Sequence, residues 1–228
     1  MSHLVNDVLD MNKLESGNIQ LERKHFNLLE LLHNTNEITR MQANESGVNY
    51  YVEDGEIIHT QLIGSPVHFQ QILMNIGSNA VKYNHNGGSV TVTCREVSYT
   101  DTTAEYELTC TDTGIGMSEE FQKRAFEPFA QEGQSARTKY AGTGLGLAIA
   151  RKLIELQGGT LFFESIQGKG TKFILHIPFE ISAEEQEKKS HTYQNCSVEG
   201  IQVLLVEDNE LNMEIAEFLL KEEKMKVT

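Results

Sequence analysis

Two neighbouring segments of the chain alternate between apolar and polar side chains, and this pattern constrains the fold more than any other feature. The segments are "SVTVTCREV" at residues 89–97 and "AEYELTCTD" at residues 104–112. Successive side chains of a β-strand point to opposite faces, so the alternation predicts two antiparallel strands that bury one face. The apolar side chains that we expect on the buried face are Val90, Val92 and Cys94, and Tyr106, Leu108 and Cys110.

Other segments predict further strands and the helices that cover this face. "VNYYVE", "TLFFES" and "KFILHIPF" have the composition of strands. Apolar residues at helical spacing predict a helix that closes near Gly47, a helix that opens at Pro66, and a helix from Leu145 to Gln157. The apolar positions of the first of these helices are Leu28, Leu29, Leu32, Ile38 and Met41. The fold class that we predict is α/β, a two-layer sandwich in which a mixed sheet packs on helices.

The composition excludes several classes of protein. A chain of 228 residues with 39% hydrophobic residues can bury a full-sized core. Its formal net charge of -14 argues against a nucleic-acid partner, because a phosphate-binding surface needs clustered Lys and Arg. The three cysteines lack metal-ligand or disulfide spacing, and no apolar run approaches the roughly 18 residues that span a bilayer. We therefore expect a cytoplasmic chain, and a membrane-anchored parent protein is compatible with this.

The helix in "QILMNIGSNAVKY" carries a polar stripe beside its apolar face. At about 100° per residue, Asn75, Asn79 and Lys82 fall on this stripe. The amide oxygen of Asn79 suits a Mg²⁺ ion that already carries phosphate oxygens, and Lys82 offers a point charge for phosphate. The alternative is a solvated helix face on which Asn occurs by accident of composition.

The motif "DTGIGM" follows the second alternating strand. Asp112 ends that strand, where its carboxylate can accept a hydrogen bond from an exocyclic amino group. Gly114 and Gly116 lack Cβ atoms, so we expect a flat ligand to approach the backbone there. The alternative is an Asx turn that closes the strand.

A second glycine-rich motif, "GTGLGLAIARKLIELQGG", precedes a helix. Gly142, Gly144 and Gly146 leave backbone N–H groups that, with the helix dipole, can meet a phosphate chain. The Rossmann fingerprint needs G-x-G-x-x-G directly after a strand, whereas the spacing here is G-x-G-x-G after a long polar loop. We therefore predict phosphate binding without a dinucleotide; close helix packing is the alternative.

Taken together and in this order, the motifs resemble the catalytic ATP-binding domain of sensor histidine kinases. The Asn-bearing helix, "DTGIGM", "FEPF" at residues 126–129 and "GTGLGLAIA" are similar to the N, G1, F and G2 boxes of that family. The resemblance covers about residues 23–180 and implies ATP and Mg²⁺ as cofactors. Ser65 departs from the family's usual G-D-P, and we expect it to affect the start of the helix rather than the nucleotide.

The resemblance also assigns roles to single residues. The nucleotide-binding residues that it implies are Asn79 on Mg²⁺, Lys82 on phosphate, Tyr83 against adenine, Asp112 on the adenine amino group, Gly114 and Gly116 beside it, Gly142, Thr143, Gly144, Leu145 and Gly146 on phosphate, and Thr171 near the base. Residues 117–141 would form a mobile ATP lid, from which Arg137 or Lys139 reaches the γ-phosphate. The catalytic residues that we predict are Asn75, Lys82, Arg137 and Lys139.

The flanking segments resemble parts of two neighbouring domains. "HLVNDVLDMNKLESGN" is similar to the end of the second helix of a dimerisation and phosphotransfer domain, and "VLLVEDNELN" is similar to the start of a receiver, with Glu207 and Asp208 as Mg²⁺ ligands. We expect the end of a dimerisation helix at 1–22, the ATP-binding domain at 23–180, a linker at 181–198 and the start of a receiver at 199–228. None of the eight histidines lies in the H-E-x-R-T-P context of a phosphoacceptor.

Three functions follow from these patterns. The first is a hybrid sensor histidine kinase, whose partners are the dimerisation and receiver domains of its parent or a cognate response regulator, and whose full-length form is a homodimer. The second is an ATPase of the gyrase and chaperone type, but those enzymes carry a Glu as general base where this chain has Asn75, which cannot take a proton at neutral pH. The third is a non-catalytic nucleotide-binding module.

Overall fold

The computed structural model describes residues 19–53, 55–132 and 143–183, with residues 8–9, 11–14 and 16–17 before them and residues 202–203, 205, 213, 220–221 and 226–227 after them. The chain divides into two compact units, Met1–Gln186 and Glu187–Thr228. Among the described residues, no helix is both long and apolar enough to cross a membrane.

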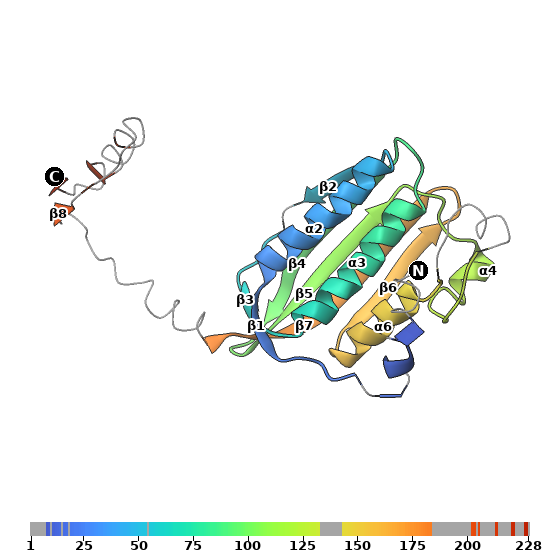
Figure 1. The fold of residues 1–228 in the computed structure, drawn as a ribbon, viewed down its shortest axis with the longest axis horizontal. Helices are drawn as coiled ribbons and strands as arrows, with labels where there is room; N and C mark the ends of the chain where they lie inside the picture. Colours follow the sequence, from blue (N-terminus) through green and yellow to red (C-terminus); the bar gives the residue numbers. More distant parts are fainter. Residues whose placement is uncertain are drawn as a thin grey trace. The chain divides into compact units, whose positions relative to one another are not determined.

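A mixed sheet of seven strands forms the floor of the first unit (Figure 1). The strands are β1 (Lys24–Asn27), β2 (Asn49–Glu53), β3 (Gln61–Gly64), β4 (Ser89–Tyr99), β5 (Thr103–Asp112), β6 (Thr160–Ile166) and β7 (Gly170–Ile181). Their order is β1-β3-β7-β5-β4-β2, and β6 also pairs with β7; β2 and β4 run parallel, and the other pairs are antiparallel. The two alternating segments are β4 and β5, and their antiparallel pairing confirms the prediction.

Three helices cover one face of this sheet, as predicted. They are α2 (Leu28–Glu45), α3 (Pro66–Lys82) and α6 (Gly146–Leu156), and they lie side by side across the sheet in Figure 1. The core between the layers includes Tyr106, Ile177 and Ile72, each with no exposed surface. The short elements β1, β3 and α4 (Glu119–Gln122) were not predicted, because four residues are too few to show a period.

The packing of α2 differs from the expectation. Leu29, Ile38 and Met41 are exposed, whereas the buried positions include Thr35 and Thr39. Both threonine hydroxyls donate to backbone carbonyls of the same helix, at 2.7 and 3.1 Å. A hydroxyl that donates to the backbone of its own helix can be buried at little cost. The helix can therefore face the sheet with these two small side chains.

The N-terminal helical residues also join the core. Leu14 is only 3% exposed, and Val8 and Met11 are partly buried against the same core. These three side chains lie at helical spacing and are used in packing, and the assignment of residues 1–22 to the end of a dimerisation helix remains a prediction.

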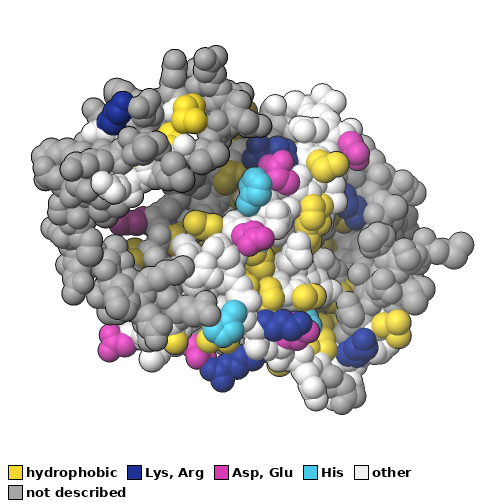
Figure 2. All heavy atoms as spheres, turned by 60° about the vertical axis from the view of Figure 1, so that its left-hand side comes forward, with side chains coloured by type: hydrophobic (Ala, Val, Ile, Leu, Met, Phe, Trp, Pro, Cys, Tyr) yellow, Lys and Arg dark blue, Asp and Glu magenta, His cyan; other side chains and the backbone are white. Residues whose placement is uncertain are grey.

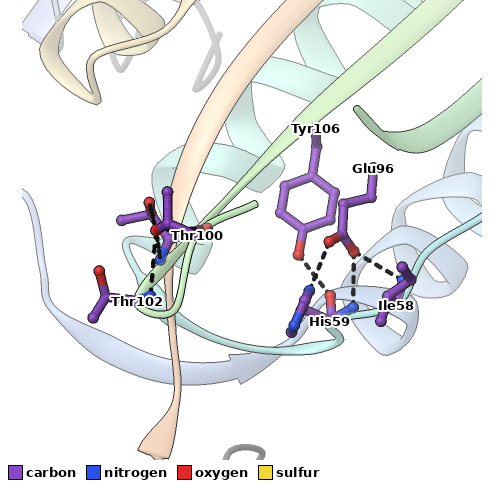
Figure 3. Close-up of polar contacts among 7 residues, drawn as sticks. Ile58, His59, Glu96, Thr100, Thr102 and Tyr106 are labelled. Carbon is purple, nitrogen blue, oxygen red and sulfur yellow. Dashed lines mark hydrogen bonds and ion pairs between the residues drawn. The ribbon is translucent and has the colours of Figure 1, made fainter. Parts of the chain in front are cut away.

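A buried carboxylate fixes the connection between β2 and β3. Glu96 Oε2 accepts the backbone N–H groups of Ile58 and His59, both at 2.8 Å, and Glu96 Oε1 lies 2.6 Å from His59 Nδ1 (Figure 3). Tyr106 donates its hydroxyl to the His59 carbonyl at 2.6 Å. Because the side chains of His59 and Glu96 are only 6% and 3% exposed, this network ties an irregular segment to β4 and β5 in a nearly dry environment.

Charged side chains are mixed on the face shown in Figure 2. Among the described residues seen there, Lys and Arg are interspersed with Asp and Glu. On the outer side of the sheet, Arg95 pairs with Glu107 at 2.6 Å, and His176 lies 3.3 Å from the same carboxylate. Basic charge on this part of the chain is therefore offset by neighbouring carboxylates.

The second unit contains a parallel pair of two-residue strands, β8 (Gln202–Val203) and β9 (Lys226–Val227). The apolar face that we expect on a C-terminal helix, formed by Leu211, Ile215, Phe218 and Leu219, lies outside the described residues. The assignment of residues 199–228 to the start of a receiver stays a prediction.

Candidate functional site

A cavity of about 280 Å³ lies between α3, the end of β5 and the start of α6. It gathers most of the residues that the sequence analysis singled out. Those that line it are Asn75, Asn79, Lys82, Tyr83, Asp112, Gly116, Thr143, Gly144, Gly146 and Thr171. Gly114 and Leu145 are not among the lining residues, and Gly142, Arg137 and Lys139 lie outside the described residues.

The polar stripe of α3 faces this cavity. Asn75, Asn79 and Lys82 all line it, while Ile72 and Ile76 of the same helix are buried in the core. The amide nitrogen of Asn75 is buried and has no hydrogen-bond partner among the described residues. A buried donor without a partner is costly, so this position favours a ligand that supplies an acceptor.

Asp112, the last residue of β5, also lines the cavity. Its Oδ1 accepts the backbone N–H groups of Gly114 at 2.8 Å and Thr171 at 3.3 Å, which leaves Oδ2 for an outside donor. Burial raises the pKa of this carboxyl from 3.8 to about 6, and the two backbone hydrogen bonds act in the opposite direction. At neutral pH the group is therefore a partly desolvated carboxylate, suited to an amino group.

The glycines after Asp112 are also required by close contacts within the chain. A Cβ at Gly114 would collide with the carbonyl oxygen of Tyr83, and a Cβ at Gly116 would collide with that of Ile166. Gly116 also has a φ of +60°, in the left-handed region. The chain's own backbone therefore needs both glycines at these positions, and Gly116 also lines the cavity, so its role beside the base stays a prediction.

The second glycine motif brings α6 to the cavity. Gly144 has a φ of +72°, and a Cβ there would lie 2.8 Å from the carbonyl oxygen of Ala130. The first turn of α6 has no side-chain cap, and its Gly146 would place a Cβ 3.6 Å from Asn75 Oδ1. The uncapped helix start therefore lies beside the polar stripe of α3, where an anion is favoured.

One residue of this motif differs from the expectation. The backbone N–H of Leu145 donates to Thr143 Oγ1 at 3.2 Å, and the Leu145 side chain is fully buried. The resemblance assigned Leu145 to phosphate, but in this structure it contributes packing and an occupied donor.

Residues 117–130 contribute an apolar wall that was not predicted. Met117, Phe121 and Ala125 line the cavity, and Ser118 is the N-cap of α4, where its hydroxyl accepts the Phe121 N–H at 3.2 Å. Their i, i+4, i+8 spacing is the signal that would have found them. Only residues 117–132 of the predicted lid are described.

A cation and an aromatic ring lie next to each other at one end of the cavity. Lys82 Nζ lies 4.8 Å from the centre of the Tyr83 ring, which places a cation and an aromatic surface together at the end of α3.

Ser65 precedes α3, is 2% exposed, and lies 2.6 Å from His68 Nδ1. It does not line the cavity, in agreement with the prediction that it affects the start of the helix.

Residues 64–181 match the family described as histidine kinase-, DNA gyrase B- and HSP90-like ATPase. The autoinducer 2 sensor kinase/phosphatase LuxQ of Vibrio cholerae is 33% identical over 218 residues, which cover 94% of this chain and 25% of that protein. The signal transduction histidine-protein kinase BarA of Escherichia coli is 32% identical over 179 residues, which cover 78% of this chain and 19% of that protein. The chain thus spans about a quarter or less of the length of these relatives.

A solved structure supports the same conclusion. Full-length ShkA in complex with AMPPNP has a TM-score of 0.65 and 26% sequence identity, and the match covers 99% of this chain and 44% of that one. The family match includes every described residue of the cavity. This chain belongs to the histidine kinase-, DNA gyrase B- and HSP90-like ATPase family, and it contains an ATP-binding domain of the kind found in sensor histidine kinases.

Proposed function

We propose that this chain is the ATP-binding kinase part of a hybrid sensor histidine kinase, which transfers the γ-phosphate of ATP to a histidine in a dimerisation domain. The observation that carries the proposal is the cavity itself. It holds a carboxylate acceptor at one wall and, along α3 and the start of α6, the amides, cation and helix terminus that suit phosphates. The relatives' names as sensor kinases and the AMPPNP in the ShkA complex support ATP as the substrate.

The adenine and phosphate ends of ATP are assigned from the chemistry of the walls. Asp112 Oδ2 is free to accept from the adenine amino group, and Met117 and Phe121 offer an apolar surface for the base. The Asn75 amide donates to a phosphate oxygen, which satisfies its unpartnered N–H. Lys82 neutralises phosphate charge from the end of the same helix.

Mg²⁺ fits this arrangement through Asn79. The described residues contain no group of three or more His, Cys, Asp and Glu side chains that could hold a metal alone. A nucleotide-bound Mg²⁺ needs only one or two protein oxygens, because phosphates and waters supply the rest. Asn79 lines the cavity, and its amide oxygen would be the protein ligand of an ion that would neutralise phosphate charge.

Transfer to histidine is favoured over hydrolysis by the residue one turn before Asn79. Asn75 cannot act as a general base for water. The Glu132 carboxylate also lines the cavity, where its Oε1 accepts the Ser118 N–H at 2.8 Å. Helix α3 therefore positions ATP without supplying a base for water. The acceptor histidine comes from a dimerisation domain, which makes the full-length protein a homodimer.

The remaining assignments follow from that role. Residues 1–22 would be the end of the dimerisation and phosphotransfer helix, residues 23–180 the kinase domain, residues 181–198 a linker and residues 199–228 the start of a receiver, with a cognate response regulator as a further partner. The lid residues Arg137 and Lys139 would contact the γ-phosphate. Because ATP is the substrate, the kinase domain would work in the cytoplasm.

The proposal is tested by label transfer from ATP that carries ³²P in its γ-phosphate. We expect no label on this chain alone and acid-labile label on a separately supplied dimerisation domain, weak because the partner is not tethered. Asn79→Ala should abolish the transfer, whereas Asn36→Ala, an exchange on α2 outside the cavity, should not. Rapid steady-state phosphate release that Asn75→Ala removes would contradict the kinase and favour the gyrase-type ATPase.

A further inference from the structure

A second cavity of about 270 Å³ lies between α2, α3 and the sheet, and it is nearly as large as the nucleotide cavity. Its floor is formed by the inward side chains of β4, β5 and β7. These include Cys94, Leu108, Cys110 and Leu175. Burial raises the pKa of both thiols to about 12, so at neutral pH the floor is uncharged and apolar.

The cavity exists because α2 does not fill the space above these strands. Thr35 and Thr39 are the buried side chains that α2 directs to this region, and both are small. Cys94, Leu108 and Cys110 keep 9%, 6% and 7% of their surface exposed, whereas Tyr106 on β5 keeps none. The middle of the sheet therefore reaches solvent through the gap below α2.

Among the described residues, the buried polar side-chain atoms around the cavity have hydrogen-bond partners, with one exception. The two threonines donate within α2, the Tyr50 hydroxyl donates to Asn36 Oδ1 at 2.9 Å, and the hydroxyls of Thr93 and Thr109 bond to each other at 2.8 Å. Arg40 also lines the cavity, and its Nε atom is buried and has no hydrogen-bond partner among the described residues. A ligand that offers an acceptor here would satisfy the one buried donor left over.

The charges at the opening indicate a neutral ligand. The exposed lining residues include His33, Glu37 and Glu53. Glu37 Oε1 lies 3.5 Å from Arg40 Nε and offsets the guanidinium charge without completing a hydrogen bond. The two carboxylates outnumber the one guanidinium, so an anion gains no net attraction, and the uncharged floor offers a cation no partner; recognition therefore depends on apolar contact and on one acceptor.

We propose that this cavity is a second ligand site, distinct from the nucleotide site, for a small uncharged aromatic molecule that carries a carbonyl acceptor. The rings lie on the apolar floor of β4, β5 and β7. The carbonyl oxygen accepts the N–H of Arg40 Nε. The guanidinium is held in place by Tyr50, whose ring centre is 5.8 Å from the Arg40 Cζ atom.

The site is tested with 6-propionyl-2-(dimethylamino)naphthalene, a neutral aromatic ketone whose fluorescence rises and shifts to the blue in apolar surroundings. The titration uses the full chain with saturating ADP, so that the nucleotide cavity is filled. We expect saturable binding at one site. The analogue 2-(dimethylamino)naphthalene, which lacks the carbonyl, should bind about tenfold more weakly, as expected for the loss of one hydrogen bond.

Two variants with matched controls locate the ligand. Val92 lines the cavity, so Val92→Phe should fill it and weaken the ketone about tenfold or more, while Val97→Phe, on the same strand outside the cavity, should leave binding unchanged. Arg40→Met should weaken the ketone about tenfold but not the analogue. Arg23→Met, at an exposed arginine paired with Glu180, should affect neither.

Three results would overturn the proposal: no saturable binding up to the solubility limit of the ketone, equal effects of Val92→Phe and Val97→Phe, or equal losses for ketone and analogue in Arg40→Met. If Val92→Phe does not fold, Arg40→Met decides alone, because it alters a partly exposed side chain. If ADP does not bind, the variants still report on this cavity, so failure of the nucleotide assignment is recognised separately.

Discussion

At the residue scale, the Asp112 carboxylate links stability to recognition. Its folded pKa of about 6 lies above the ordinary 3.8, so the empty domain loses stability as the pH rises from about 3.8 to about 6, and the full cost remains above pH 6. Asp112→Asn keeps an oxygen for Gly114 and Thr171 and removes the charge. Urea unfolding without nucleotide should show the variant more stable by about 1–2 kcal/mol at pH 8, with the difference gone below pH 4. A less stable variant at pH 8 would contradict this.

The same substitution should weaken nucleotide binding. An adenine amino group needs an acceptor, and the amide that replaces the carboxylate could present N–H groups in its place. We expect Asp112→Asn to weaken ADP at least about tenfold at pH 8. In the wild type, affinity should fall as the pH drops through 6, because the carboxylate is protonated. Calorimetry at pH 8 and at a pH below 6 measures the ADP affinity of both proteins. The control is Asp101→Asn in the exposed β4–β5 turn. An unchanged affinity would remove Asp112 from the site.

Single residues were predictable where their chemistry depends on spacing alone. Asn75, Asn79 and Lys82 share a face of any helix that contains them, so the sequence was sufficient to place them on one wall. The roles of Gly114, Gly116 and Leu145 were not predictable. They depend on backbone carbonyls and hydroxyls that reach these positions from Tyr83, Ile166 and Thr143, and sequence spacing does not describe such contacts.

At the element scale, the loop after β5 depends on Gly116 for two reasons that can be separated. A Cβ there would be strained at a φ of +60° and would also collide with the Ile166 carbonyl. Gly168 has a φ of +79° but nothing within 4 Å of its Cβ position. We expect Gly168→Ala to lower the free energy of unfolding by about 1 kcal/mol and Gly116→Ala by about 3 kcal/mol or more. Equal losses in urea unfolding would show that the collision is relieved.

The connection between β2 and β3 should depend on the buried Glu96. Glu96→Gln replaces one oxygen of a carboxylate that accepts from Ile58 and His59 and contacts the His59 ring, so one nearly dry interaction is lost. We expect a loss of about 2–3 kcal/mol in the free energy of unfolding. The control is Glu107→Gln on the outer side of the sheet, where the paired Arg95 is largely exposed and the loss should stay below about 1 kcal/mol. Equal losses in the two variants would show that the buried Glu96 contributes no more to stability than the Glu107 ion pair.

Elements were predictable where their period was long enough. β4, β5, β7, α3 and α6 carry repeated apolar positions, whereas β1 and β3 have four residues each and are defined by their pairing with other strands. The predicted buried face of α2 was wrong, because it too depends on a neighbouring element. Its leucines and methionine suggested a buried stripe, but close approach to α3 at Gly77, where a Cβ would lie 3.1 Å from Thr39 Cγ2, favours small side chains inside.

At the scale of the whole domain, α3 separates two cavities. Asn75, Asn79 and Lys82 face the nucleotide cavity, Leu73, Ile76 and Gly77 face the second one, and Phe173 of β7 lines both. A ligand in the second cavity would replace an incompletely packed surface below α2 and α3 with contacts, which restrains α3. When one ligand already restrains α3, the nucleotide loses less conformational entropy of the helix on binding. Each ligand should therefore raise the affinity of the other.

We therefore expect saturating 6-propionyl-2-(dimethylamino)naphthalene to tighten ADP binding about threefold, a coupling of about 0.7 kcal/mol. Linkage requires that saturating ADP tighten the ketone by the same factor, so both titrations are measured on the same protein. Val92→Phe should remove the coupling by occupying the cavity, and Val97→Phe should preserve it. Competition between the ligands would place both in the nucleotide cavity. Independent binding would show that α3 is rigid enough to isolate its two faces, because a helix that does not respond to packing on one side cannot transmit it to the other.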